Sequence, residues 1–222
     1  MKGSYPGNYD LYAGQTPEQT VGPFFCQGLV RIAATFQSAQ LCRSERDVLH
    51  NLLADEATPG ERLRIEGTVY DGLDRPIPDA LVEIWQADAE GRYAHPLQPG
   101  DPHRDTVFQS SGFQGFGRAA TDDSGRFFFE TIRPGALPGP GNGVQAAHIN
   151  VVLGARGMPR LAFTRIYFAD DPALAADPVL ALVPAERRAT LLARRRADSP
   201  DRRTHVFDLH LQGARETVFF DF

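Results

Sequence analysis

The feature that most constrains the fold is an alternation of apolar and polar side chains with a period of two. Residues 63–69 carry it clearly, because Leu63, Ile65 and Val69 are separated by polar or charged residues or by glycine. Successive side chains of a β-strand point to opposite faces, so this period is typical of a strand with one buried face. Similar runs follow, each bounded by Gly, Pro or Asp: residues 81–85, 126–131, 149–153, 161–168, 205–211 and 216–220. Short strands at this spacing predict an all-β fold, specifically an antiparallel β-sandwich.

The first quarter of the chain differs from this pattern. Residues 1–21 are rich in Gly, Pro, Tyr and Gln and lack periodicity, which predicts an extended arm. Ser44 is a suitable N-cap for a short helix that Thr58-Pro59-Gly60 would end. We therefore expect residues 1–60 to form an N-terminal arm with a short helix, and residues 61–222 to form the β-sandwich core of one structural domain.

A second helix is expected at residues 184–196, where Pro184 suits the first turn. The basic run at residues 194–196, with Arg202 and Arg203 nearby, would then lie at the solvated C-terminal end of that helix. Positive charge is favourable there because it opposes the negative pole of the helix dipole. Binding of an anionic ligand is the alternative interpretation of these arginines.

Composition excludes several classes of partner. The 222 residues are 42% hydrophobic and 23% charged, as in an ordinary globular domain, and the net charge of −5 argues against nucleic acid or an anionic membrane surface. Cys26 and Cys42 do not form a CxxC pair, so buried thiols are favoured over a disulfide. The sequence has neither a secretory leader nor the roughly 18 apolar residues of a membrane helix, and we expect a cytoplasmic protein.

Several motifs together resemble one enzyme family. Residues 67–71 and 75–85 are of a kind shared by transthyretin-like and carboxypeptidase-regulatory sandwiches. Their continuation to Tyr93, with residues 117–122 and 131–135, is similar to the intradiol ring-cleavage dioxygenases. In that family a ferric ion is held by Tyr, Tyr, His and His, and the enzyme opens a catechol ring with O2.

The two ends of the chain narrow this resemblance. Gln19-Thr20-Val21-Gly22-Pro23-Phe24 and residues 216–222 resemble the α subunits of α/β members of the family that act on protocatechuate, 3,4-dihydroxybenzoate. The resemblance runs from about Thr16 to the C-terminus. It implies a β-subunit partner that binds the Fe(3+), and a small aromatic substrate that is cleaved with O2 to 3-carboxy-cis,cis-muconate.

The positions that match the family's iron ligands are incomplete in this chain. They read Tyr93, Leu137, His148 and Asn150. Leucine cannot bind a metal, and an amide is a poor ligand for ferric iron compared with phenolate or imidazole. Gln145 also stands where the resemblance implies a catalytic arginine. We therefore expect neither a metal ion nor a catalytic residue in this chain, and we expect Leu137→Tyr with Asn150→His to recover only some metal affinity.

What the resemblance leaves to this chain is substrate binding at the partner's iron site. Thr20, Gly22 and Arg156 match positions that line the mouth of that site, and Arg156 would face the carboxylate of the substrate. Arg156 could instead be an ordinary turn arginine after a strand, and Thr20 a cap of a helix or turn.

Three interpretations of function follow. The first is the α subunit of an α/β dioxygenase. The second is a transthyretin-like binding or scaffold module with a decayed metal site. The third is a self-sufficient intradiol enzyme with an altered iron shell. Charge transfer from phenolate to ferric iron colours an iron-loaded protein, so a colourless lone chain would reject the third interpretation. Colour together with activity on addition of a β partner would reject the second.

Overall fold

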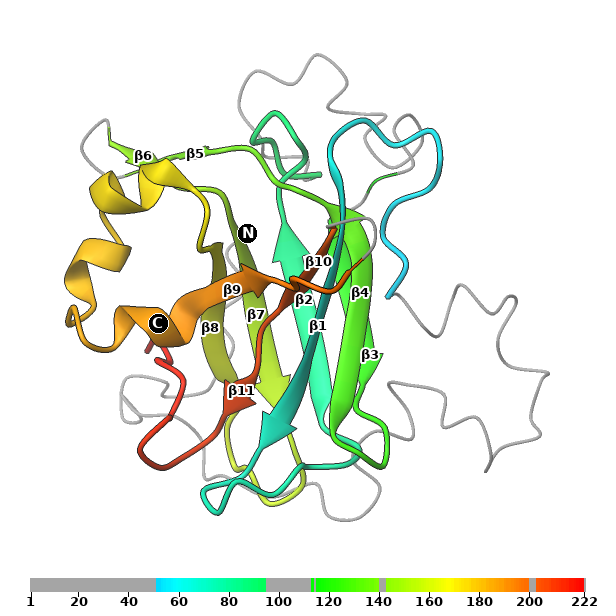
Figure 1. The fold of residues 1–222 in the computed structure, drawn as a ribbon, viewed down its shortest axis with the longest axis vertical. Helices are drawn as coiled ribbons and strands as arrows, with labels where there is room; N and C mark the ends of the chain where they lie inside the picture. Colours follow the sequence, from blue (N-terminus) through cyan, green and yellow to red (C-terminus); the bar gives the residue numbers. More distant parts are fainter. Residues whose placement is uncertain (1–50, 95–112, 114, 140–142, 200–202, 222) are drawn as a thin grey trace, which may run out of the picture.

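The structure, a computed structural model, describes residues 51–94, 113, 115–139, 143–199 and 203–221. Within these ranges nine strands form one large sheet and two short strands form a separate ladder (Figure 1). The large sheet contains β1 (Arg62–Tyr70), β2 (Leu81–Gln86), β3 (Phe116–Ala120), β4 (Arg126–Ile132), β7 (His148–Gly154), β8 (Ala162–Phe168), β9 (Leu192–Arg195), β10 (Thr204–Val206) and β11 (Leu209–His210). The small ladder joins β5 (Leu137–Pro138) to β6 (Val144–Gln145). Three 3-10 helices follow β8: η5 (Pro172–Ala176), η6 (Leu180–Leu182) and η7 (Arg188–Leu191).

The large sheet nearly closes on itself. Its order is β11-β1-β10-β9-β8-β7-β2-β3, and β4 also pairs with β1. β3 and β4 contact each other, which brings the two ends of this order together. The prediction of a mostly β fold is confirmed. The pairs β1/β10, β1/β11 and β8/β9 are parallel, and they join the antiparallel ladders into one continuous, nearly closed sheet.

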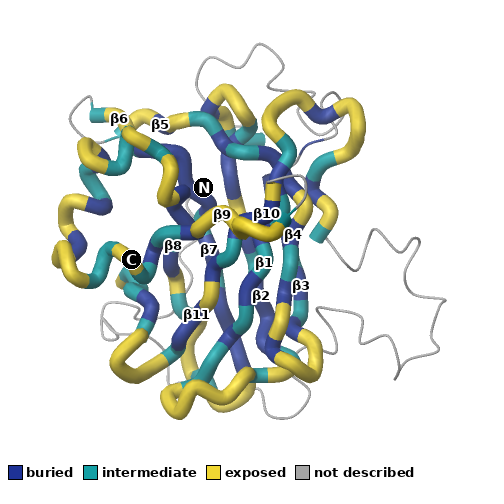
Figure 2. The backbone as a smooth tube through the Cα atoms, in the orientation of Figure 1, coloured by how far each residue is buried: buried dark blue, intermediate teal, exposed yellow. Residues whose placement is uncertain are grey.

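The main core lies inside the curve of this sheet. Residues of β1 and β4 face residues of β2 and β7 across it, and the buried backbone is drawn dark blue in Figure 2. The alternation seen in the sequence accounts for this, since every second residue of β1 is buried: Leu63, Ile65, Gly67 and Val69. Burial of one strand face supplies the main stabilisation of such a layer.

A second, smaller cluster lies on the outer side of β7 and β8. It contains Ala146, Tyr167, Leu180, Val183 and Leu191, so the 3-10 helices cover this part of the sheet. This cover matters for function, because it buries side chains at the start of β7 that would otherwise face solvent.

The predicted helix at residues 184–196 is wrong. η7 ends at Leu191 and the chain continues as β9, which pairs with β8 on one side and β10 on the other. Ladder hydrogen bonds on two sides satisfy the backbone of this segment, and this tertiary pairing outweighs a local helical pattern.

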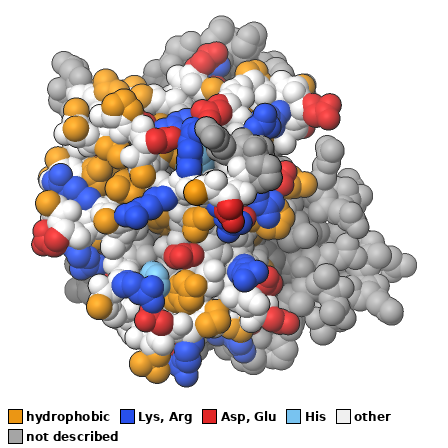
Figure 3. All heavy atoms as spheres, in the orientation of Figure 1, with side chains coloured by type: hydrophobic (Ala, Val, Ile, Leu, Met, Phe, Trp, Pro, Cys, Tyr) orange, Lys and Arg blue, Asp and Glu red, His pale blue; other side chains and the backbone are white. Residues whose placement is uncertain are grey.

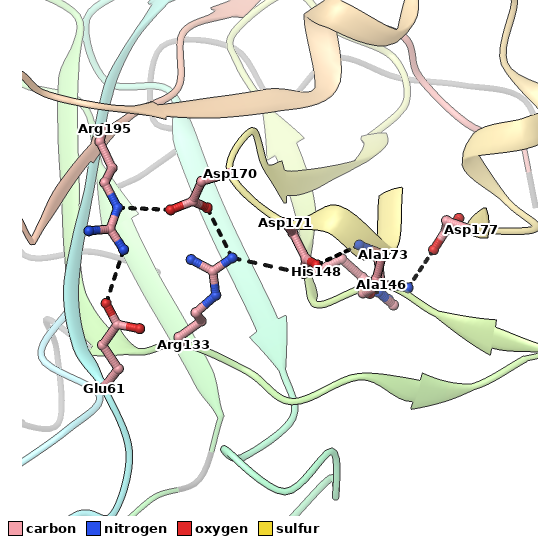
Figure 4. Close-up of polar contacts among 9 residues, drawn as sticks. All are labelled: Glu61, Arg133, Ala146, His148, Asp170, Asp171, Ala173, Asp177 and Arg195. Atoms are coloured by element: carbon pink, nitrogen blue, oxygen red, sulfur yellow. Dashed lines mark hydrogen bonds and ion pairs between the residues drawn. The ribbon is translucent and has the colours of Figure 1, made fainter. Parts of the chain in front are cut away.

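The arginines of this segment therefore complement no helix dipole. Arg195 lies 2.9 Å from Asp170 and 3.2 Å from Glu61 (Figure 4). Arg196 forms an ion pair with Glu66. On this face of the molecule acidic and basic side chains lie side by side (Figure 3). Carboxylates thus neutralise Arg195 and Arg196, so these two arginines need no anionic ligand.

Three other predictions about local structure need correction. Residues 205–211 form two strands, β10 and β11, separated at Phe207 and Asp208. Residues 216–220 contribute only an isolated bridge, from Phe220 to Phe163. β3 and β9 were not expected.

The N-terminal arm, Ser44, Cys26 and Cys42 lie outside the described residues. Leu52, which lies inside the expected first helix, forms a β-bridge to Glu130 of β4. No helix among the described residues is long and apolar enough to cross a membrane.

Gly67 lies where β1 closely approaches the segment between β10 and β11. A Cβ atom at Gly67 would lie 1.8 Å from the backbone oxygen of Phe207, which cannot move away as a flexible side chain can. We expect Gly67→Ala to lower the free energy of unfolding by about 3 kcal/mol or more. At Gly72 the nearest atom is the side-chain Cβ of Gln212 at 3.1 Å, so Gly72→Ala should cost less than about 1 kcal/mol. Equal losses in chemical denaturation would contradict this packing.

Candidate functional site

The candidate site is built on β7, which lies between β2 and β8. Ile149, Val151 and Leu153 of this strand point into the main core, so the residues between them face outward. The strand register places Asn150 between Trp85 of β2 and Arg165 of β8. It places His148 opposite Tyr167 of β8. Two of the four positions expected from the family are thus set side by side on one outward face.

Tyr93 and Asn150 are brought together directly. The side-chain amide of Asn150 donates a hydrogen bond to the hydroxyl of Tyr93 at 3.0 Å. The Tyr93 ring also makes an edge contact with Trp85, with 6.2 Å between ring centroids. Burial raises the pKa of Tyr93, although the hydrogen bond from Asn150 and the charge of Arg165 act in the opposite direction. Tyr93 is therefore a neutral phenol near pH 7.

His148 is buried, with 1% of its surface exposed. Its Nδ1 lies 2.8 Å from the backbone oxygen of Ala146, so the proton of the neutral ring is on Nδ1. The ring packs against Tyr167, with 5.6 Å between ring centroids. Burial, and then the nearby charge of Arg165, lower the pKa of His148 to about 4. The imidazole is therefore neutral at physiological pH.

Leu137 and Gln145 face each other in the small ladder of β5 and β6. Leu137 is buried and presents only methyl groups. The amide nitrogen of Gln145 donates to the backbone oxygen of Pro138 at 2.8 Å, and its amide oxygen accepts from Arg165 at 2.8 Å. Both hydrogen-bonding ends of Gln145 are thus engaged.

Three residues that organise this site belong to none of the motifs found in the sequence: Arg165, Tyr167 and Asp177. Arg165 donates from the same terminal nitrogen to Gln145 and to the hydroxyl of Tyr167, the latter at 3.3 Å. The hydroxyl of Tyr167 lies 3.3 Å from a carboxylate oxygen of Asp177. A signal was present, because an arginine within the apolar strand Ala162–Phe168 requires a specific partner.

Asp177 is a buried carboxylate that holds the start of β7 to the 3-10 helices. It is 1% exposed and accepts backbone hydrogen bonds from Val179 and Leu180 through one oxygen. Its other oxygen accepts from the nitrogen of Ala146 at 2.8 Å (Figure 4). These bonds satisfy the buried charge and fix the segment that precedes His148.

The residues at the four positions do not fit a ferric ion. Leu137 offers no donor atom, the Asn150 amide is bound to Tyr93, and a guanidinium lies beside them. Within the described part of the chain, no three His, Cys, Asp or Glu side chains gather as metal ligands. The arrangement is a closed network of hydrogen bonds around an arginine and supplies no open coordination position.

Arg156 lies away from this network, just beyond the opposite end of β7. Its Nε is 3.0 Å from Asp79, in the turn that leads into β2. Both residues line an open groove of about 1060 Å³ beside β1 and β3, in which Arg126 and Asp122 also take part. Arg156 is thus in a turn after a strand, as one interpretation held, but it borders a cavity. Thr20 and Gly22 lie outside the described residues.

Comparison with known proteins identifies the relatives of this chain. The sequence profile of the family described as Dioxygenase matches residues 36–213. The chain is 41% identical over 210 residues to the protocatechuate 3,4-dioxygenase alpha chain of Burkholderia cepacia, across 93% of this chain and 97% of that protein. It is 33% identical over 190 residues to the beta chain from the same organism, across 83% of this chain and 79% of that protein.

A solved structure shares the fold. Catechol 1,2-dioxygenase from Acinetobacter sp. ADP1, inhibited by bound mercury, superposes with a TM-score of 0.57 at 26% identity. The match covers 73% of this chain and 56% of that chain. The fold described above is therefore shared with this dioxygenase.

The buried, neutral His148 predicts a specific dependence of stability on pH. Its pKa is about 4 in the folded chain and near 6.5 when unfolded, so the unfolded chain takes up this proton first as the pH falls. The contribution is fully present above about pH 6.5 and is lost as the pH falls toward 4. Between pH 7 and 4.5 we expect His148→Gln to lose about 2–3 kcal/mol less unfolding free energy than the native chain. If chemical denaturation gives the same pH dependence of the unfolding free energy for His148→Gln and for the native chain, this prediction is wrong.

Proposed function

The chain belongs to the intradiol ring-cleavage dioxygenase family, and from that premise we propose that it is the non-iron-binding α subunit of a protocatechuate 3,4-dioxygenase. Its partner is the β subunit of that enzyme, which carries the Fe(3+). The complex opens the ring of 3,4-dihydroxybenzoate with O2 to give 3-carboxy-cis,cis-muconate. The chain contributes to substrate binding in the partner's pocket and holds no catalytic residue of its own.

One observation carries this proposal: the positions for iron are filled by groups that cannot serve it. Leu137 is apolar, and the Asn150 amide is committed to Tyr93. A chain that belongs to the family and lacks a usable metal site must act with another chain to catalyse the family's reaction. The similarity to an alpha chain across nearly the whole length of both proteins supports the same conclusion.

Arg156 is the proposed contact to the carboxylate of the substrate. Asp79 engages only its Nε, and among the described residues neither terminal nitrogen has a partner. Asp79 therefore orients the guanidinium and leaves two N–H edges available for a carboxylate, the geometry that arginine recognises best. Thr20 and Gly22 remain proposed as further lining residues of the same pocket.

Two other functions compete with this one. A transthyretin-like binding module would lack ring-cleaving activity with any partner, and a self-sufficient enzyme would bind iron by itself. Co-expression with an iron-bearing β subunit separates them, because only the proposed function requires both chains for ring cleavage. Formation of an active, coloured complex supports it.

We expect the chain expressed alone to bind no stoichiometric iron and to lack the visible absorbance of a ferric phenolate. The expectation follows from the missing donor at Leu137 and the occupied amide at Asn150. Metal analysis of the purified chain provides the measurement, and the co-expressed complex serves as the positive control. About one ferric ion per isolated chain, together with catechol cleavage, would end the non-catalytic interpretation.

Arg156→Ala in the α/β complex should raise KM for protocatechuate and affect kcat less. A charge-assisted hydrogen bond contributes roughly 1.5–3 kcal/mol, which corresponds to roughly a tenfold to hundredfold change in apparent affinity. A lost ground-state contact acts mainly on KM. Steady-state kinetics with protocatechuate and with catechol, which has no carboxylate, provide the measurement.

Asp79→Asn is the matched control, because it keeps the arginine and removes the negative charge that orients it. We expect a smaller rise in KM from Asp79→Asn than from Arg156→Ala. If Arg156→Ala impairs catechol and protocatechuate equally, then Arg156 supports the subunit interface and does not recognise the substrate.

A further inference from the structure

We propose that Thr121 is a positioning residue for Arg156: it holds the backbone turn at Asp79, whose carboxylate fixes the direction of the guanidinium. The inference rests on the proposed contact between Arg156 and the substrate, and it adds a residue on which that contact depends. Thr121 lies in the motif of residues 117–122, which supplies none of the positions that match the iron ligands.

The strand register brings these three residues to one end of the large sheet. At this end β3, β2 and β7 pair across a single row, which consists of Ala120, Leu81 and Gly154. Thr121 directly follows β3, Asp79 lies two residues before β2, and Arg156 lies two residues after β7. The fold therefore places Thr121 beside the turn that leads into β2, and that turn beside Arg156.

Thr121 makes four hydrogen bonds to this turn, two through its side chain and two through its backbone. Its hydroxyl donates to the backbone oxygen of Ile77 at 2.7 Å and accepts from the backbone nitrogen of Ala80 at 2.8 Å. Its backbone nitrogen donates to the oxygen of Ala80 at 2.9 Å, and its backbone oxygen accepts from the nitrogen of Asp79 at 3.2 Å. Thr121 is 6% exposed, so water competes little for these bonds. The hydroxyl thus ties together the residues on both sides of Asp79.

The turn needs this support because Asp79 has a positive φ of 56°. Residues other than glycine adopt this left-handed region at a cost in free energy, although aspartate tolerates it better than most. Such a conformation persists only where the surrounding structure enforces it. Relaxation to a negative φ would rotate the backbone about the N–Cα bond and turn the carboxylate in another direction. The bonds from Thr121 to Ile77 and Ala80 oppose that relaxation.

The direction of the Arg156 guanidinium depends on this carboxylate. The two oxygens of Asp79 lie 3.2 Å and 3.0 Å from Nε of Arg156. The Arg156 side chain is 48% exposed, so packing restricts its rotamers only in part. An arginine that is already oriented loses less side-chain entropy when it binds a carboxylate than a freely rotating one. Thr121, acting through Asp79, thus lowers the entropic cost of substrate binding.

The test compares Thr121→Val, Thr121→Ser and Thr164→Val with the native chain in the α/β complex. Thr121→Val removes the hydroxyl and keeps the shape of the side chain, whereas Thr121→Ser keeps the hydroxyl. Thr164→Val is the matched control, because the hydroxyl of Thr164 is also buried and donates to a backbone oxygen, that of Val218, at 2.7 Å. If circular dichroism shows that Thr121→Val does not fold, Thr121→Ala takes its place.

We expect Thr121→Val to raise KM for protocatechuate about threefold to tenfold, with little change in kcat or in KM for catechol. Thr121→Ser and Thr164→Val should keep the native KM. In the Arg156→Ala background Thr121→Val should add nothing, because its effect passes through Arg156. The proposal would be overturned by an equal rise for catechol, by an equal rise from Thr121→Ser or Thr164→Val, or by a further rise in the Arg156→Ala background.

Nuclear magnetic resonance of the full ¹⁵N-labelled chain tests the same arrangement without substrate. The Nε–H signal of Arg156, identified by its loss in Arg156→Ala, reports the hydrogen bond to Asp79. We expect this proton to exchange with water about threefold to tenfold faster in Thr121→Val, and at the native rate in Thr121→Ser and Thr164→Val. An unchanged rate in Thr121→Val would overturn the role of Thr121. An unchanged KM in Arg156→Ala would instead overturn the substrate contact on which the inference rests, so the two failures are distinguishable.

Discussion

The register of β7 between β2 and β8 is the constraint on which the rest of the site depends. Ile149, Val151 and Leu153 face the core, so His148 and Asn150 must face outward. A slip of one residue would bury the polar set and expose the apolar one, a change that the core does not allow. The same register sets Arg165 beside Asn150 and Tyr167 beside His148. The chemical character of the outer face thus follows from the packing of the inner one.

The sequence predicted the long strands well and the short ones poorly, for a physical reason. β1, β2, β4, β7 and β8 have six or more residues, so their apolar pattern is visible without any knowledge of the partner strand. β9, β10 and β11 are shorter and gain their order from neighbours far away in the sequence. Residues 192–195 illustrate this, because their helical pattern was overridden by parallel pairing with β8.

The candidate site was likewise predictable only in part. Tyr93, Leu137, His148 and Asn150 were found through resemblance to a family, and the loss of ligand chemistry follows from residue type alone. Arg165 escaped notice because it belongs to no motif, and its role arises from contacts to Gln145 and Tyr167 that only the folded chain creates. Asp177 likewise lies in an irregular segment. Its carboxylate accepts hydrogen bonds from three backbone N–H groups, and no sequence pattern indicates these contacts.

The positions that match the iron ligands and the proposed substrate contact lie at opposite ends of β7. His148 begins β7, and Arg156 follows its last residue, Gly154, so the two lie roughly 26 Å apart along the extended chain. Side chains at that separation share no partner, and substitutions at one end leave the other energetically untouched. The positions that match the iron ligands and the groove that contains Arg156 can therefore vary independently of each other.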